Sequence, residues 1–581
     1  MAEPKSIVYV DEDVGVDEAS VPGTEAQPFK TVVFAYIQTQ GAADYLTRKS
    51  KTGTVLEGAD KSALLEWKPA AKSALKKAVN ALQQHQKKAA REKELAVQRQ
   101  KEDKARHAAF EEAKKIVIEE DSSLPKAKRI RLDDQEDIKL RSASAAGDSV
   151  EERGTRIRVF GRVHNLRKQK DVIFIELKDG YGKMQCLLTG KLAKTYDALT
   201  LTRETSIEIY GELYEVPPGA KASLNRELHA DYFRIEPIWK AAGGEDAITT
   251  RVAPGADPTT LLNLRHLTLR GDKASAVMLV RDYIEHAFLS VYRSLRMRKV
   301  SPPALVQTQV EGGATLFKFD YYGETSFLTQ SSQLYLETCL PSMGDVYCIE
   351  KSFRAEKSLT RRHLSEYTHI EAELDFISFD DLLDHIELVI SRVIEMILGD
   401  PETASHIKRL NPSFEVPKLP FLRMRYSDAI DWLNEHGIEN EDGKTHAFGD
   451  DIAEAAERRM TDILNQTVLL THFPVEIKAF YMQKDKNDPR VTESVDVLVP
   501  GVGEVVGGSM RMDDYNELMA AYKREGIDPE PYYWYIDQRK YGSSPHGGYG
   551  LGLERFLAWI CGLHTVREAC LYPRYMNRCT P

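Results

Sequence analysis

The chain has 581 residues, of which 42% are hydrophobic and 29% charged, and its formal net charge is −10, so it is long enough for about three or four domains. The acidic balance argues against a protein that coats nucleic acid over its whole surface, and the six cysteines are scattered without a CxxC pair, which predicts neither a zinc site nor a disulfide framework. No apolar run approaches membrane-spanning length and the N-terminus lacks the pattern of a signal peptide, so we expect a soluble protein of a reducing compartment.

The first 120 residues divide into two parts. Residues 1–60 contain short β-like runs, Ser6 to Val10 and Thr31 to Ile37, among turn residues, and predict a small appended domain. Residues 61–120 predict a basic helix, because Ala70 to Ile118 contains no glycine or proline and its basic residues outnumber the acidic ones by about two to one. Such a helix either carries a solvated charged surface or contacts phosphates, and each phosphate contact would be sensitive to salt.

The rest of the chain falls into four segments that differ in composition, residues 121–153, 154–240, 241–275 and 276–581. The first predicts a linker, with Pro125, a basic cluster and a stretch of Ser, Ala and Gly. The second returns to short β-like runs with glycine turns, which predicts a small barrel. The third begins with a connection rich in Pro, Gly and Ala and predicts a hinge. The fourth predicts helices at Ala274 to Arg296 and Phe379 to Leu398 and contains every catalytic-looking cluster.

Residues 352–376 predict two strands around a short polar loop, Lys357 to Arg362. Arg354 and Glu356 are two residues apart on the first run, so we expect them on one face. The second run alternates apolar residues with a polar set, Tyr367, His369, Glu371, Glu373 and Asp375. Burying such charges without partners is costly, so the hairpin predicts a site for a charged ligand, with a solvated sheet face as the alternative.

Residues 543–560 predict a glycine-rich strand that runs directly into a helix. The strand glycines are Gly547, Gly548, Gly550 and Gly552. The apolar stripe of the helix is Leu553, Phe556, Leu557 and Ile560, and Arg555 points away from it. Glycines on a strand leave room for something flat near the backbone, and Arg555 could then reach a ring or a phosphate, although bulges or close packing explain the glycines equally well.

Residues 492–512 combine acidic residues, glycines and one arginine. The acidic residues are Glu493, Asp496 and Glu504. Carboxylates near a phosphate-binding arginine imply Mg²⁺, which proteins usually hold through one or two carboxylates and the phosphates of the ligand. The spacing from Glu504 to Arg511 would put these residues on opposite faces of a regular strand, so we expect a bend at Gly507 and Gly508.

Together these three segments resemble motif 2, motif 3 and the intervening metal-binding strand of the class II aminoacyl-tRNA synthetases for aspartate, asparagine and lysine. The segment RKVSPPALVQTQVEGGA resembles motif 1 of this family, and residues 155–240 resemble its anticodon-binding OB domain. The resemblance implies a multidomain α+β protein, in which a class II antiparallel sheet flanked by helices follows a β-barrel OB domain and an N-terminal extension with a basic helix. The segments SSQLYLETC and PHGGYGLGLERFLAWI resemble the eukaryotic cytosolic branch that is specific for asparagine.

This resemblance implies that L-asparagine is activated with ATP and Mg²⁺ as cofactors and transferred to tRNA(Asn) in the cytoplasm. It assigns catalytic roles to Arg354, Arg555 and Glu504, and metal binding to Glu504 and Asp496. The implied ATP-binding residues are Arg354, Ala355, Glu356, Arg362, His363, Leu364, Glu504, Gly552, Leu553, Glu554 and Arg555. The implied amino-acid-binding residues are Glu311, Gln333, Leu336, Arg354 and Arg511.

The choice of asparagine over aspartate depends on Leu336. Aspartyl members of the family carry a lysine where this chain has Leu336, and a carboxylate substrate needs that cation. Arg511 could donate to the side-chain oxygen of asparagine, while a carboxylate that the sequence does not identify would accept from its NH₂ group.

Outside the catalytic domain, the resemblance implies that Arg167, Phe174 and Gln185 read the anticodon and that Pro303 lies at the interface of a homodimer. Partners are then tRNA(Asn), contacted by the barrel, the catalytic domain and the basic helix, and L-asparagine, without a membrane. Three alternatives stay open: an aspartyl-tRNA synthetase, a catalytically inactive tRNA-binding or signalling paralogue, and an ammonia-ligating asparagine synthetase on the same catalytic fold. Arg354, Glu504 and Arg555 argue against the second, and the barrel argues against the third.

Overall fold

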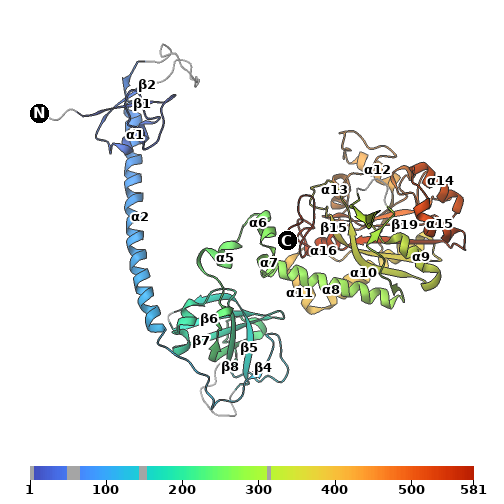
Figure 1. Cartoon of the computed structure of the whole chain (residues 1–581), viewed down its shortest axis with the longest axis horizontal. Coiled ribbons are helices and arrows are strands. Elements are labelled where there is room, and N and C mark those ends of the chain that lie inside the picture. The colour runs from blue at the N-terminus through green and yellow to red at the C-terminus, as the bar shows by residue number, and fades with distance from the viewer. Residues whose placement is uncertain (1–4, 49–65, 143–153, 170, 311–315) are drawn as a thin grey trace. The chain divides into compact units, whose positions relative to one another are not determined.

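The computed structural model of the chain describes residues 5–48, 66–142, 154–169, 171–310 and 316–581 (Figure 1). The chain divides into two compact units, Met1–Ala247 and Ile248–Pro581. In the described part of the chain, no helix is both long and apolar enough to cross a membrane.

The first unit begins with a three-stranded sheet in which β1 (Ile7–Asp11) runs parallel to β2 (Asp44–Arg48), and β3 (Lys68–Pro69) pairs antiparallel with β2. The strand predicted at Thr31 to Ile37 is wrong, because this segment forms helix α1 (Val32–Gln38). The Thr31 hydroxyl accepts a hydrogen bond from the backbone N–H of Phe34 and caps the helix, and Val32 and Ala35 are buried one turn apart. The cap and the helical spacing of the buried residues outweigh the β propensity of Val32 and Val33.

The predicted basic helix is confirmed as α2 (Lys72–Ala113), a single helix of 42 residues (Figure 1). At its N-terminal end Ala74, Leu75 and Ala78 pack on the apolar cluster of the three-stranded sheet. Its other side exposes a row of basic residues, Lys76, Lys77, Lys87, Lys88 and Arg91. The small N-terminal domain therefore extends past residue 60 and includes the first turns of the helix.

The segment predicted as a linker forms part of the barrel over its described residues, 121–142. Strand β4 (Lys128–Arg129) runs parallel to β5 (Arg156–Lys168), and Ile130 and Leu132 are buried in the barrel core. The basic residues of this segment alternate with apolar ones, so an edge strand can point the apolar side chains into the core and the basic ones to solvent. The remainder of the predicted linker lies outside the described residues.

The predicted barrel is confirmed. Its other strands are β6 (Val172–Lys178), β7 (Lys183–Thr189), β8 (Ser206–Glu215) and β9 (Arg226–Arg234), with short helices α3 (Gly190–Ala193) and α4 (Tyr196–Thr200) after β7. The strand order is β4-β5-β6-β7-β9-β8, and pairing of β5 with β8 closes the barrel. Alternate residues such as Ile173, Ile175 and Leu177 fill the interior, which leaves the intervening side chains outside.

The second unit is built on an eight-stranded sheet in the order β10-β14-β15-β20-β19-β18-β17-β16. All neighbouring strands are antiparallel except the edge pairs β10–β14 and β16–β17. In chain order the strands are β10 (Arg298–Lys299), β14 (Val346–Phe353), β15 (Glu366–Asp375), β16 (Leu422–Arg425), β17 (Val468–Thr471), β18 (Ser494–Val499), β19 (Gly503–Met510) and β20 (His546–Gly552). A smaller sheet has the order β11-β13-β12, from Leu305–Val306, Glu324–Leu328 and Lys318–Tyr321.

Helices α8 (Asp272–Ser294), α10 (Phe379–Gly399) and α16 (Leu553–Cys561) share one apolar core with the sheet (Figure 1). The first two confirm the helices predicted in this unit. The apolar side chains of β15, Ile370, Ala372 and Leu374, point into this core, and the polar side chains of the same strand point to the opposite face.

Shorter helices complete the second unit. Those before α8 occupy the predicted hinge region and are α5 (Ile248–Arg251), α6 (Pro258–Asn263) and α7 (Arg265–Thr268). Those after it are α9 (Gln333–Met343), α11 (Pro401–Leu410), α12 (Tyr426–Glu435), α13 (Glu454–Leu464), α14 (Tyr515–Glu525) and α15 (Tyr533–Ile536).

The glycines of β20 make the polar face of the sheet possible. A Cβ atom at Gly550 would lie 2.2 Å from the ring of His369, and one at Gly548 would lie 2.3 Å from the carboxyl group of Glu373. The close approach predicted at these glycines is therefore made by side chains of the neighbouring strand β15.

We expect Gly550→Ala to lower the free energy of unfolding of the second unit by about 1–3 kcal/mol, because the His369 ring must be displaced. The matched control is Gly399→Ala at the end of α10, where a Cβ atom meets nothing within 4 Å. Urea unfolding of both variants measures the difference, and equal stabilities would contradict the steric argument.

Candidate active site

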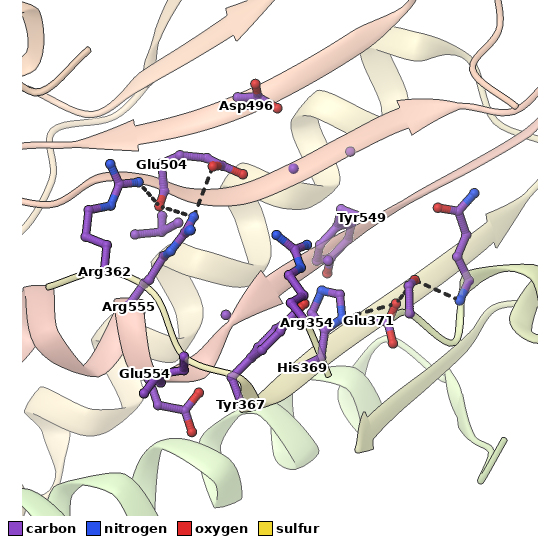
Figure 2. Close-up of a pocket in the computed structure, with 18 of the residues that line it drawn as sticks. Arg354, Arg362, Tyr367, His369, Glu371, Asp496, Glu504, Tyr549, Glu554 and Arg555 are labelled. Atoms are coloured by element: carbon purple, nitrogen blue, oxygen red, sulfur yellow. Dashed lines mark hydrogen bonds and ion pairs between the residues drawn. The ribbon is translucent and has the colours of Figure 1, made fainter. Parts of the chain in front are cut away.

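A cavity of about 220 Å³ lies over the polar face of β15, β18, β19 and β20 (Figure 2). The loop between β14 and β15 and the start of α16 close one end, where Arg362 and Arg555 lie beside Glu504. At the other end Ser331 and Gln333 come from the start of α9. Four arginines, several carboxylates and two glycine-rich strands therefore surround one space.

The predicted hairpin is confirmed as β14 and β15, but its first strand ends earlier than predicted. Tyr367, His369, Glu371 and Glu373 line the cavity from β15. Strand β14 ends at Phe353, so Arg354 and Glu356 lie in the loop and do not share a strand face. The backbone N–H of Arg354 still donates to the carbonyl of Ser365 at 3.0 Å, which fixes the start of the loop.

Glu504 is the centre of the arginine-rich end. Arg555 donates to its carboxylate at 3.0 Å and to its backbone carbonyl at 3.2 Å, and Arg362 donates to the same carbonyl at 3.3 Å. Burial raises the pKa of Glu504, but the positive charges of Arg555, Lys478 and Arg362 outweigh it and bring the pKa down to about 2. This end of the cavity therefore keeps an ionised carboxylate among cations at neutral pH.

A second carboxylate, Asp496, lies beside Glu504. A Cβ atom on Gly507 would be 3.4 Å from Glu504 Oε1 and 3.5 Å from Asp496 Oδ1, so both side chains face the same gap. Lys478 Nζ donates to Asp496 at 2.7 Å. Burial raises the pKa of Asp496 to about 6, helped by the charge of Glu504 and opposed by Lys478. Two carboxylates that repel each other in a buried space are suited to bind a divalent cation, because its charge would offset theirs.

A β-bulge, and not the predicted glycine pair, brings Glu504 and Arg511 to one face. The register of β18 against β19 shifts between Val497 and Leu498, which pair with Val506 and Glu504, so Val505 is the extra residue. Gly507, Ser509 and Arg511 then follow at every second position. The expected bend exists, but it lies before the glycines.

Arg511 is buried in a network of carboxylates. It forms a two-nitrogen ion pair with Glu373, and its Nε lies 4.0 Å from Glu337. Burial opposes a charged Arg511, yet Glu373 and Glu337 raise the pKa of the guanidinium above its ordinary value. Glu337 in turn accepts from Arg539 at 2.9 Å and lies 3.0 Å from His546 Nε2. One end of the cavity thus presents an arginine whose charge is already compensated.

Several predicted residues do line the cavity, namely Gln333, Arg354, Arg362, His363, Leu364, Asp496, Glu504, Arg511, Gly552, Glu554 and Arg555. Glu554 is already engaged, because it pairs with Arg281 at 2.9 Å and accepts from the backbone N–H of Thr368 at 3.0 Å. Glu311 lies outside the described residues.

Other predicted residues do not line the cavity. Leu336 is fully buried in a separate apolar cluster with Leu340 and Cys348 and does not line the cavity, so its contact with the amino acid stays a prediction. Leu553 points into the core of the sheet, which leaves only its backbone for a ligand. Ala355 and Glu356 are outside the lining, and Glu356 instead lies 3.4 Å from His363 Nε2.

Sequence reasoning missed some lining residues. Lys478 and Tyr481 come from the segment between β17 and β18, which carries no motif, and nothing in the sequence pointed to them. Glu371 and Glu373 were visible as part of a polar face but received no role. Ser331 and the backbone N–H of Ser332 donate to Glu371.

The predicted anticodon residues lie together on the outside of the barrel. Arg167 on β5 pairs in register with Phe174 on β6, and its guanidinium carbon is 4.4 Å from the centre of the Phe174 ring. Gln185 on β7 pairs with Glu176, two residues after Phe174, and donates to Glu227 at 2.7 Å. The three side chains thus form one outer surface with an aromatic face and polar groups beside it.

Comparison with known families agrees with this division of the chain. Residues 257–576 match the family described as "tRNA synthetases class II (D, K and N)", residues 157–236 match "OB-fold nucleic acid binding domain", and residues 24–125 match "Asparaginal-tRNA synthetase, N-terminal domain". The class II match alone covers more than half of the sequence.

Full-length relatives and solved structures give the same result. The chain is 50% identical over 576 residues to the cytoplasmic asparagine–tRNA ligase of Saccharomyces cerevisiae, covering 99% of this chain and 100% of that one. It is 47% identical to the cytoplasmic enzyme of Homo sapiens, with 99% of each covered. The Entamoeba histolytica asparaginyl-tRNA synthetase bound to asparaginyl-adenylate superposes with a TM-score of 0.71 at 40% identity, covering 79% of this chain and 100% of that one.

The pH dependence of stability should report the crowded carboxylates near Glu504. Burial, with the charges of Glu504 and Asp496, raises the pKa of Glu457 on α13 from 4.5 to about 8. Between these values the folded protein binds a proton that the unfolded chain releases, so this group lowers stability as the pH rises through that window. We expect Glu457→Gln to raise the apparent Tm of the second unit by about 2 °C at pH 8.5 and to leave it unchanged near pH 4.5.

Thermal melts at pH 4.5, 6.5 and 8.5 measure this effect. The matched control is Glu435→Gln at the exposed end of α12, which should follow the wild-type curve. A Glu457→Gln shift of the same size at every pH would show that the carboxylate is not protonated in the folded protein.

Proposed function

The chain belongs to the cytoplasmic asparagine–tRNA ligases, a branch of the class II aminoacyl-tRNA synthetases, and we propose that its arginine-lined cavity activates L-asparagine with ATP. The observation that supports this most directly is the convergence of Arg354, Arg362 and Arg555 on one cavity that also holds Glu504 and Asp496. Arginines match the charge and the geometry of phosphate oxygens, and the paired carboxylates match Mg²⁺.

The arginine-rich end would hold the triphosphate. Arg354, at the start of the loop, is assigned to the α-phosphate, and Arg555, at the start of α16, to the terminal phosphate and the adenine. Glu504 and Asp496 would hold Mg²⁺ together with phosphate oxygens, since no third His, Cys, Asp or Glu joins them in a metal-binding group within the described ranges. When bound, the ion neutralises charge on the phosphates.

The amino acid would lie at the other end of the cavity, beside Arg511. An amide oxygen can accept from Arg511, and the adjacent Glu373 can then accept from the amide NH₂ because its carboxylate has lone pairs beyond those used by Arg511. The side chain of aspartate would instead add a negative charge next to Glu373 and Glu337. Discrimination between asparagine and aspartate would therefore come from Arg511 with its paired carboxylates. Leu336 matters only because this position then carries no lysine.

The reaction needs positioning and charge stabilisation and no side-chain nucleophile. A carboxylate oxygen of asparagine attacks the α-phosphorus, the bond to the bridging oxygen breaks, and pyrophosphate leaves with the electron pair. The terminal hydroxyl of the tRNA then attacks the carbonyl carbon of asparaginyl-adenylate, loses its proton, and AMP leaves. Arg354 and Arg555 stabilise the negative charge that develops at the phosphorus.

The remaining assignments concern partners. We propose that Arg167, Phe174 and Gln185 read anticodon bases and that the exposed basic residues of α2 contact tRNA phosphates. We also propose a homodimer that uses the exposed Pro303 and the neighbouring small sheet, where Leu305, Tyr321 and Tyr322 are exposed apolar side chains.

ATP–pyrophosphate exchange tests the activation step. We expect wild-type protein to exchange with asparagine and not with aspartate, and Arg354→Ala to lower the asparagine-dependent rate by about 10²–10³. Lys357→Ala is the control, because this exposed cation of the same loop does not line the cavity. Exchange that depends on aspartate, or an unaffected Arg354→Ala variant, would contradict the assignment.

Aminoacylation tests the barrel surface separately. We expect Phe174→Ala to weaken tRNA binding by about 1–3 kcal/mol, the value of one stacked base, and to leave asparagine-dependent exchange unchanged. Phe160→Ala is the matched control, since this barrel phenylalanine also lies under an arginine, Arg158, at 5.5 Å. The KM for tRNA should rise only in the Phe174 variant, and an equal rise in both would assign the loss to the barrel as a whole.

A further inference from the structure

A second groove, of about 620 Å³, lies directly beside the cavity. It is bounded by the loop between β14 and β15, the segment after α11, the start of α13 and the end of α16. None of the functional assignments above uses this groove.

Arg362 belongs to the walls of both spaces. Its side chain is only 9% exposed, its Nη1 lies 3.5 Å from Glu454 on the groove side, and its Nη2 donates to the Glu504 carbonyl at 3.3 Å on the cavity side. Its buried Nε has no hydrogen-bond partner among the described residues. These contacts are longer than the 2.7–2.9 Å of a good charge-assisted bond, so the guanidinium is incompletely satisfied.

The walls of the groove carry more cations than carboxylates. Two carboxylates, Glu415 and Glu454, and four cations, Arg361, Arg362, Arg458 and Lys418, line the groove. Arg361 donates to His564 Nδ1 at 3.2 Å, and Lys418 is exposed to solvent. A groove whose walls carry mostly one sign of charge concentrates ions of the opposite sign.

We propose that this groove is the exit path of pyrophosphate and that Arg362 passes the leaving anion from the cavity into it. The proposal rests on the proposed function, because asparagine activation is what produces the pyrophosphate. When the α-phosphorus–oxygen bond breaks, the anion is released at the arginine-rich end of the cavity, and Arg362 is the cation that faces both spaces. Arg361, Arg458 and Lys418 draw the anion outward, and in the reverse reaction they collect it.

The double variant Lys418→Gln/Arg458→Gln tests this path, since neither residue lines the cavity. In asparagine-dependent ATP–pyrophosphate exchange, we expect its KM for pyrophosphate to rise about threefold to tenfold, the scale of one or two exposed ion pairs. The KM values for ATP, asparagine and tRNA should stay unchanged. Added salt should raise the KM for pyrophosphate less in the variant than in the wild type.

The matched control is Arg459→Gln/Lys523→Gln, which removes two exposed cations from α13 and α14 outside the groove. An unchanged KM for pyrophosphate overturns the proposal, and a rise in the KM for tRNA alone would assign the groove to the acceptor end instead. Titration calorimetry with pyrophosphate alone separates this failure from failure of the proposed function. Wild-type binding that weakens severalfold in the double variant supports the groove even without exchange activity, and equal affinities refute it.

Discussion

The pairing of buried charges across the polar face of the eight-stranded sheet is the constraint on which the second unit depends. Arg511 with Glu373, Arg539 with Glu337, and Arg281 with Glu554 each join residues that are far apart in the sequence. Removing one partner of such a pair costs roughly 3–5 kcal/mol, because the other charge is left buried. The first pair therefore joins β15 to the end of β19, the second joins α9 to the segment after α15, and the third joins α8 to the start of α16. Of these elements, β15, β19, α9 and α16 line the cavity.

The backbone is adapted to this arrangement. Gly548 and Gly550 leave the space that Glu373 and His369 occupy, and the bulge at Val505 turns Glu504 toward the same side as Arg511. The opposite face needs no such devices, since Ile370, Ala372 and Leu374 pack on α10 and α16 with ordinary alternation. These irregular features of the sheet thus serve the face that lines the cavity.

The sequence predicted the helices and strands that have a regular hydrophobic pattern, and the site residues that belong to a recognisable motif. It predicted α8, α10, the barrel strands, and the convergence of Arg354, Glu504 and Arg555 through family resemblance. The prediction failed where local caps or tertiary contacts determine the structure. Thr31 caps a helix in a segment whose β propensity predicts a strand. Leu132 packs in the barrel core although its segment has the composition of a linker. The sequence also did not show the burial of Leu336 among Leu340 and Cys348, because that burial depends on where α9 meets β14.

The arginine-rich end can bind a polyphosphate and still be stable without one. The arrangement of charges explains this, because carboxylates reduce the repulsion between the arginines. In the described structure Glu504 pairs with Arg555, and its charge and that of Glu454 oppose the repulsion that Arg555 exerts on Arg362. Phosphate oxygens would compete for the same donors, and a divalent cation held by Glu504 and Asp496 would relieve the repulsion that helps to raise the pKa of Asp496. Ligand binding would therefore replace ion pairs between arginines and carboxylates with ion pairs between arginines and phosphates. Its free energy is the difference between these two sets of ion pairs.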